Sequence, residues 1–216
     1  MNGRIPVWQG LGMAERRCGT APPPADRTVH DRDWDTLDLD GHRHERTAFA
    51  EVDLTGATAR GAVFRECTFR GVEFNTAELV DSAFLNCAFT RCSFFDASFT
   101  DCKLVGSVFD GGAFDLLKVD GGDWSLVGLP GADLRRASFT GVMMREVDLT
   151  GANCAGTTLH RVDLADAWLH GADLSRADLR GSDLSALDPL ATTVRGALID
   201  PEQAFTIAAS LGLRLG

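Results

Sequence analysis

The sequence contains no run of 18 consecutive apolar residues, which is the length a helix needs to cross a bilayer. Its N-terminus carries Arg4, Arg16 and Arg17 but no continuous apolar stretch, so we expect no secretory signal. These two absences predict a cytoplasmic protein without a membrane partner.

Basic residues are scarce relative to acidic ones. The chain has 21 Lys and Arg against 31 Asp and Glu, a net charge of −10, and residues 34–216 alone carry −11. An acidic surface repels nucleic acid and favours basic protein surfaces. The alternative is that the acids only keep the protein soluble. In either case we expect no direct contact with nucleic acid.

The dominant positive feature is a five-residue period that runs from Trp34 to Leu184 without an insertion. Every residue whose number ends in 4 or 9 belongs to one column, and 28 of these 31 residues are Leu, Phe, Met, Val or Trp. Two residues earlier lies a column of mostly small residues, as in Ala132-Asp133-Leu134. A fixed short period of this length predicts a stacked array.

A period of five fits neither regular element. A helix turns about 100° per residue, so the apolar column would spread around its surface. A continuous strand alternates faces, so an odd period would send successive large residues to opposite sides. Short extended segments joined by bends solve both problems, and Gly fills the bend position in 13 of 31 repeats.

Four right-angle bends would close one coil of 20 residues. Large residues would then stack on their own kind, with Phe49, Phe69, Phe89 and Phe109 in one ladder. We therefore expect an all-β solenoid of about eight coils, roughly 37 Å long at the strand spacing of about 4.8 Å.

Three segments follow from the limits of the period. Residues 1–33 lack it and are Pro-rich near Pro22, so we expect a largely disordered leader. Residues 34–188 form the solenoid. Residues 189–216 hold a last unit that is out of phase, and then a helix that starts at Asp200-Pro201, runs through Ser210 and stops at Gly212.

The open end of a β-solenoid must be capped or paired, because exposed backbone edges invite association. One alternative is a folded-back cap on a monomer. We favour the other, a two-fold homodimer joined through the C-terminus. The apolar residues expected at that interface are Phe205, Ile207, Ala208, Leu211, Leu213 and Leu215.

The sequence shows no catalytic constellation, no phosphate-binding glycine loop and no metal site, so we expect neither an enzyme nor a cofactor. His160 and His170 should point outward from opposite sides, and His42 and His44 should point inward in the first coil. Five cysteines occupy inward columns, where they act as small apolar residues. Cys67 and Cys87 would stack one coil apart, within reach of a disulfide, although reduced thiols are expected in the cytoplasm.

What remains is stacked surface charge. A net of −11 over the expected rod is one charge per about 3.4 Å, half the density of duplex DNA. A DNA mimic is therefore physically plausible. The acids expected to form its binding surface lie near the middle of the chain: Asp96, Asp101, Asp110, Asp115, Asp120 and Asp123.

The repeat resembles the pentapeptide repeat family, whose members fold as right-handed quadrilateral β-helices. The handedness is implied by the resemblance and not by the spacing. The C-terminal stretch from Gly196 to Leu215 resembles the cap of pentapeptide proteins that act on DNA gyrase, among them the Qnr group and the mycobacterial fluoroquinolone-resistance protein.

This second resemblance implies a homodimer that binds the gyrase A subunits in place of DNA. Such a protein would modulate or inhibit a type II topoisomerase. It would confer resistance to quinolones or to another topoisomerase poison, including a self-made one. The alternative function is a scaffold that binds another protein through an outward apolar patch formed by Val80, Leu85, Phe95 and Val105.

Overall fold

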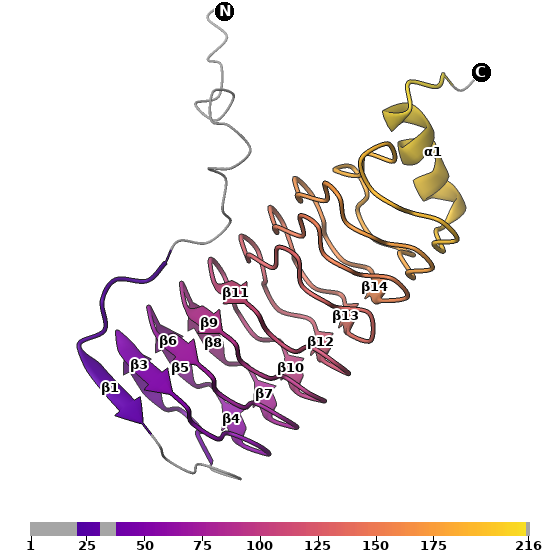
Figure 1. Ribbon diagram of the computed structural model, residues 1–216. Helices are drawn as coiled ribbons and strands as arrows, with labels where there is room; N and C mark the ends of the chain where they lie inside the picture. Colours follow the sequence, from indigo (N-terminus) through magenta and orange to yellow (C-terminus); the bar gives the residue numbers. More distant parts are fainter. Residues whose placement is uncertain (1–20, 31–37, 215–216) are drawn as a thin grey trace, which may run out of the picture.

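The computed structural model describes residues 21–30 and 38–214, and they form a parallel β-solenoid with one short helix at its C-terminal end (Figure 1). Each coil has four sides, because four separate ladders of parallel pairing run along the molecule. Partners along each ladder are 20 residues apart, as in Phe69 with Phe89. The expected quadrilateral coil of 20 residues is therefore confirmed.

We name the four sides by their ladders, in the order in which the chain meets them. The three-strand side contains β2 (Arg43–Glu45), β5 (Val63–Arg65) and β8 (Ala83–Leu85). The five-strand side contains β1 (Arg27–His30), β3 (Thr47–Ala50), β6 (Thr68–Arg70), β9 (Ala88–Thr90) and β11 (Val108–Asp110). The bridge side has isolated parallel bridges only, for example Asp53 with Glu73 and Asp133 with Asn153.

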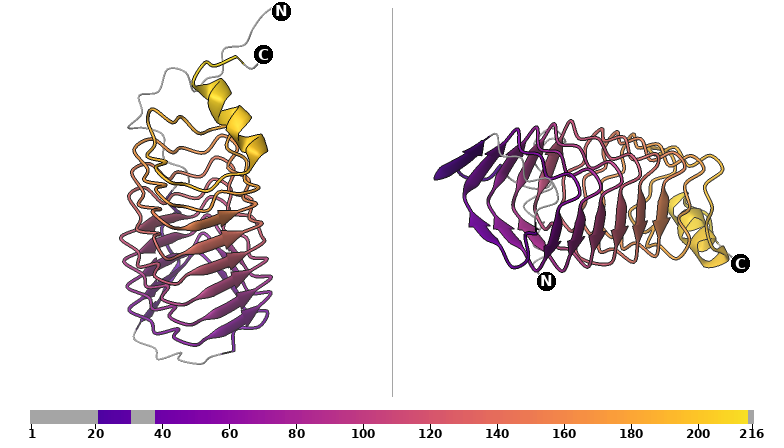
Figure 2. Two further views of the ribbon diagram at one scale, coloured as in Figure 1. Left: turned by 90° about the vertical axis from the view of Figure 1, so that its right-hand side faces the viewer. Right: turned by 90° about the horizontal axis from the view of Figure 1, so that it is seen from below.

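The six-strand side completes each coil and lies opposite the five-strand side (Figure 2). It contains β4 (Thr58–Arg60), β7 (Glu78–Val80), β10 (Ser98–Thr100), β12 (Lys118–Asp120), β13 (Ser138–Thr140) and β14 (Thr158–His160). Regular strands thus extend over six coils, slightly fewer than the eight expected. Isolated bridges continue this ladder to Asp38 at one end and to Asp178 and Leu198 at the other.

The core consists of the two inward columns. Phe49, Phe69, Phe89 and Phe109 stack with nearly parallel rings, and successive ring centroids lie 4.9, 4.8 and 4.6 Å apart. Leu129, Leu149 and Leu169 continue this ladder in the buried core. Small residues such as Ala62 and Ala77 are fully buried beside the large ones. The large side chains fill the coil, so the second column has room only for small ones.

The bends follow the large column by two residues and adopt positive φ. Gly131 has φ +67° and Asp101, which occupies the same position of another repeat, has φ +52°. A residue with a Cβ is strained at positive φ, so glycine is favoured there. Gly122 is a separate case, because it lies in the small column and a Cβ on it would come within 2.1 Å of the Cys102 carbonyl oxygen.

The solenoid begins earlier than the repeat predicted. Strand β1 pairs in parallel with β3, and Val29 lies beside Phe49 in the large column. Arg27 Nε donates a hydrogen bond of 2.8 Å to Thr47 Oγ1. The expectation that residues 1–33 form only a leader is therefore wrong for Arg27–His30. Residues 1–20 and 31–37 lie outside the described part of the chain.

The C-terminal cap is the helix α1 (Pro201–Ser210), with Asp200 at the N-cap and Gly212 just after its end, as predicted. One side chain, Gln203, fastens it to the last coils. Its Nε2 donates to the carbonyl oxygens of Leu179 and Ser182, both at 2.7 Å, and its Oε1 accepts from the Asp200 amide at 2.6 Å. A buried polar residue therefore anchors the helix, together with the apolar contact of Ile207 with the core.

Candidate functional site

The described residues contain no group of three or more His, Cys, Asp or Glu side chains placed to hold a metal ion. His160 lies on the six-strand side and His170 follows the opposite side, as expected. His44 points inward and stacks on Phe64 at 5.2 Å, and burial, with Arg27 and His42 nearby, lowers its pKa. The His42 ring lies 6.0 Å from that of His44 and is exposed.

The five described cysteines are buried and free. Burial raises the pKa of Cys92 and of Cys102 to about 11 and that of Cys154 to about 12. The thiols of Cys67 and Cys87 contact each other in adjacent coils, and burial raises the pKa of Cys87 well above its usual range. Protonated thiols are poor nucleophiles, so Cys87, Cys92, Cys102 and Cys154 serve the core, whereas the hydrogen bond with Cys87 lowers the pKa of Cys67.

The six aspartates predicted as one binding surface encircle the rod. Asp101 and Asp120 lie on the six-strand side, and Asp96 and Asp115 on the bridge side. Asp110 ends β11 on the five-strand side, while Asp123 lies in the ladder of the three-strand side. A single flat partner surface cannot contact all six. They form a girdle of charge about the middle of the rod.

Two members of this girdle are paired with cations. Lys118 Nζ lies 2.7 Å from Asp96 Oδ1, and Arg136 Nη1 lies 3.1 Å from Asp115 Oδ2. Both pairs are exposed, and exposed pairs contribute little to stability because water screens them. They nevertheless leave Asp101, Asp110, Asp120 and Asp123 without an ion pair of their own in the described part of the chain.

The acids are unevenly placed along each side of the rod. The first half of the bridge side carries Asp53, Glu73, Asp96 and Asp115 and has no basic residue. Its second half carries four arginines against two aspartates. These six residues are Asp133, Arg135, Arg136, Asp173, Arg176 and Arg195. The bridge side is therefore acidic only in its first half, and negative charge does not cover the rod uniformly.

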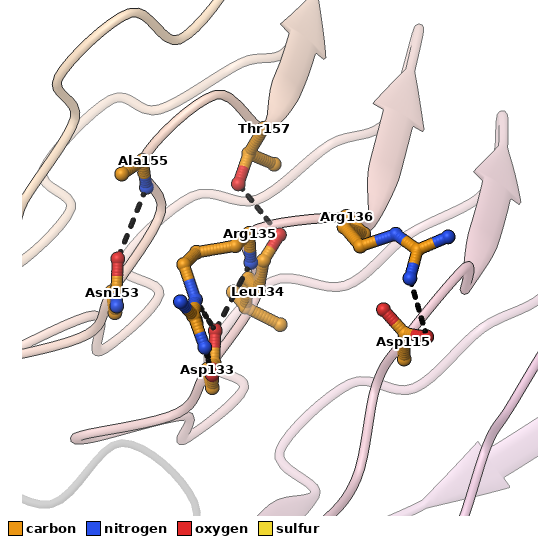
Figure 3. A network of polar contacts seen from close by, with 8 residues as sticks. All are labelled: Asp115, Asp133, Leu134, Arg135, Arg136, Asn153, Ala155 and Thr157. Atoms are coloured by element: carbon orange, nitrogen blue, oxygen red, sulfur yellow. Dashed lines mark hydrogen bonds and ion pairs between the residues drawn. The ribbon is translucent and has the colours of Figure 1, made fainter.

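Figure 3 shows the polar contacts at the point where the charge of the bridge side changes from negative to positive. Arg135 Nη2 lies 2.6 Å from Asp133 Oδ2 and its Nε lies 2.9 Å from Oδ1, and this contact lowers the pKa of Asp133. Thr157 Oγ1 donates to the Leu134 carbonyl oxygen at 2.6 Å, and the Ala155 amide donates to Asn153 Oδ1 at 3.3 Å. These side-chain contacts join residues of the same coil or of adjacent coils.

The C-terminal end presents an apolar surface. Leu190, Leu198, Phe205, Leu211 and Leu213 are large apolar side chains that are exposed. Of the residues predicted at a dimer interface, Ile207 packs against the chain's own core and Ala208 is half-buried. Leu215 lies outside the described residues. Phe205, Leu211 and Leu213 therefore remain the accessible part of the predicted interface.

The apolar patch expected for a scaffold is not contiguous. Leu85 and Val105 are neighbours on the three-strand side, because the Asn86 amide donates to the Val105 carbonyl oxygen. Val80 ends β7 on the six-strand side, and Phe95 follows Ser93 on the bridge side, across the coil from Leu85. The prediction of one patch is wrong, since successive repeats point in different directions.

The family model described as pentapeptide repeats matches the chain in eight copies, over residues 49–84, 129–153 and 157–188. These residues lie in the coils described above. These three stretches of the chain are pentapeptide repeats. No curated protein matches its sequence.

Several solved structures resemble this chain. Full-length QnrB1, a plasmid-mediated fluoroquinolone resistance protein, is 19% identical with a TM-score of 0.42; the match covers 86% of this chain and 100% of that one. HetL from the cyanobacterium Nostoc sp. strain PCC 7120, involved in heterocyst differentiation regulation, is 16% identical with a TM-score of 0.35, covering 81% and 86%. At these values the likeness assigns neither a function nor a partner to this chain.

Proposed function

We propose that this protein binds a type II topoisomerase, DNA gyrase, on the surface that otherwise holds DNA, and thereby modulates or inhibits the enzyme. The observation that carries the proposal is the girdle of acids on a rigid rod. Four of its members have no ion pair among the described residues, so their charge is available to a basic partner. Because the girdle encircles the rod, it suits a saddle or channel better than a flat surface.

The backbone supports this role physically. Consecutive coils are held together by parallel ladders, so each charged side chain is fixed to within the flexibility of its own rotamers. Rigid presentation lowers the entropy that binding must overcome. Duplex DNA is likewise a stiff rod with regularly spaced negative charge. Since the protein would act on gyrase in the cytoplasm, resistance to quinolones or to another topoisomerase poison would follow from displacing DNA from the enzyme.

We further propose that two copies join through the exposed apolar surface of the C-terminal end. Phe205, Leu211 and Leu213 would be buried between two caps related by a two-fold axis. The resulting molecule would have two acidic arms that point away from one centre. This arrangement matches a two-fold symmetric enzyme, because each arm would meet an equivalent subunit.

The test is DNA supercoiling by gyrase with increasing amounts of the purified protein, with and without a quinolone. We expect inhibition that depends on protein concentration and weakens as salt rises, because the charges are exposed. Replacing Asp110, Asp115 and Asp120 by Lys reverses the charge at one girdle residue on each of three sides of the rod. This variant should bind gyrase at least tenfold more weakly, roughly 1.4 kcal/mol.

The matched control reverses the charges of Asp38 and Asp40, which lie at the N-terminal end of the rod. These substitutions should weaken binding much less. Equal effects of the two sets would point to unspecific attraction between an acidic protein and a basic one. Absence of binding, of inhibition and of protection against the drug would refute the proposal.

A further inference from the structure

The three-strand side carries several outward apolar side chains along its middle. Its ladder is unbroken, from Arg43 through β5 and β8 to Lys103, Asp123, Met143 and Asp183. Leu126 and Met143 are 39% and 45% exposed, which is unusual for large apolar side chains in this molecule. The outward apolar residues on this side are Val63, Ala83, Leu85, Val105, Leu126 and Met143.

The two ends of this side carry opposite charge. The first four rungs hold four basic and two acidic side chains: Arg43, Arg46, Arg65 and Lys103 against Glu45 and Glu66. The last four rungs hold five acidic and one basic: Asp123, Glu146, Asp163, Asp166 and Asp183 against Arg145. These rungs therefore change from a net of +2 to a net of −4 between Lys103 and Asp123, and two of their cations are paired within the chain, Arg46 with Asp26 at 2.8 Å and Arg145 with Asp163 at 2.6 Å.

From this pattern we propose that the three-strand side binds the same side of a second copy of this chain, with the two rods antiparallel. The two-fold axis passes between the rungs of Lys103 and Asp123. Lys103 then faces the partner's Asp123, and Arg43 faces the partner's Asp183. This contact goes beyond the proposed function and does not depend on it.

The same axis also aligns the apolar residues. Leu85 lies in the third rung from the N-terminal end, and this rung meets the partner's rung of Met143, the third from the other end, where Arg145 occupies the position equivalent to that of Leu85. The rung of Val105 meets the partner's rung of Leu126 beside the axis. Burial of these four side chains in each copy supplies non-directional attraction, and the charged ends fix the register.

Only the antiparallel arrangement satisfies the charges. A parallel pair would place Arg43 on the partner's Arg43 and Asp183 on the partner's Asp183, and like charges in contact are unfavourable. Two acids oppose the antiparallel pair, because Glu45 lies in the rung that meets Asp183 and Glu66 lies in the rung that meets Asp163 and Asp166. Attraction at Arg43, Arg65 and Lys103 outweighs these two repulsions. The contact is narrow, so we expect a weak dimer that high salt dissociates.

The experiment is sedimentation equilibrium of the full chain carrying Phe205→Asp and Leu213→Asp, which removes the C-terminal contact. At low salt we expect reversible dimers, and at roughly tenfold higher salt mostly monomers. Met143→Asp should abolish the dimer. Monomers at every concentration and salt would refute the proposal, without bearing on gyrase binding.

A charge exchange provides the decisive control. Within one chain Arg43 and Asp183 are seven ladder steps apart, about 34 Å, so they cannot contact each other. Arg43→Asp and Asp183→Arg should each weaken the dimer about tenfold, because each occurs twice in it. The double variant should recover most of the loss, since the exchanged charges again face opposite ones.

Arg70→Asp, an exposed charge reversal on the five-strand side, should leave the dimer unchanged. Circular dichroism would establish that every variant keeps its β structure. Additive weakening in the double variant, with no recovery, would show that the two residues never meet and would overturn the antiparallel arrangement.

Discussion

At the scale of single residues, the position within the five-residue repeat decides what a side chain does. Phe89 is 2% exposed and stacks between Phe69 and Phe109. Thr90 follows it in the chain and points outward. Adjacent residues therefore differ completely in environment, and the difference can be measured.

Phe89→Ala should lower the free energy of unfolding by about 3–5 kcal/mol, the usual cost of truncating a buried Phe. The loss combines apolar burial with a cavity between two rigid rings. Thr90→Ala should change it by less than about 0.5 kcal/mol. Chemical denaturation of the two variants and the parent gives both values. Similar losses for Phe89→Ala and Thr90→Ala would contradict the assignment of the inward column.

Two glycines separate the effects of backbone strain and steric clash. Gly131 has positive φ and open space around its missing Cβ, so Gly131→Ala costs only the strain, about 1–2 kcal/mol. Gly122 also has positive φ, but there a Cβ would overlap the backbone of Cys102. Gly122→Ala should therefore destabilise considerably more than Gly131→Ala. Melting temperatures of the two variants would show this, and an equal decrease would exclude the close approach of these coils.

At the scale of elements, strands and helix are stabilised differently. Each strand has only three or four residues and depends on the coils above and below it. The helix α1 covers the last coils and is fixed by hydrogen bonds of the buried Gln203. The strands are secured by many equivalent contacts, whereas the orientation of the helix rests on a few specific ones.

Gln203→Ala should release α1 while leaving the rod folded. The substitution removes the donor for two carbonyl oxygens and the acceptor for the Asp200 amide, and each buried group left unpaired costs about 1–3 kcal/mol. Amide hydrogen exchange should accelerate in residues 201–210 and remain slow in the coils. Thr206→Ala, at an exposed position of the same helix, serves as the control. Protected helix amides in Gln203→Ala would show that apolar contacts such as that of Ile207 suffice.

At the scale of the whole molecule, a solenoid has two ends and four sides, and two copies can bind each other through an end or through a side. None of the helices in the described part of the chain has the length and apolar character needed to cross a bilayer. Most of the exposed large apolar side chains instead lie at the C-terminal end, two (Leu126 and Met143) lie on the three-strand side, and Phe95 lies on the bridge side. The C-terminal end and the three-strand side are independent surfaces, so their contributions can be separated by salt.

Deleting residues 201–216, or combining Phe205→Asp with Leu213→Asp, should halve the mass measured by light scattering at high salt. High salt suppresses the lateral contact, whereas contact through the apolar cap persists. The β signal in circular dichroism should remain, because the coils depend mainly on their neighbours. A parent protein that is monomeric at micromolar concentration would refute the C-terminal dimer.

The amino-acid sequence by itself determined the coil, because a five-residue period leaves no other way to bury one large and one small residue per repeat. It also placed Phe89 inside and located α1 from Asp200, Pro201 and Gly212. It did not indicate that β1 belongs to the solenoid, since Val29 alone keeps the large column there.

Only the tertiary structure decided which residues share a surface. Acids close in sequence, such as Asp110, Asp115 and Asp120, diverge because each bend turns the chain to another side. Residues far apart, such as Arg43 and Asp183, align because the coils stack in register. Gln203 anchors the cap for the same reason, since its partners come from coils more than 20 residues away. Local periodicity sets the direction of each side chain, while stacking decides its neighbours.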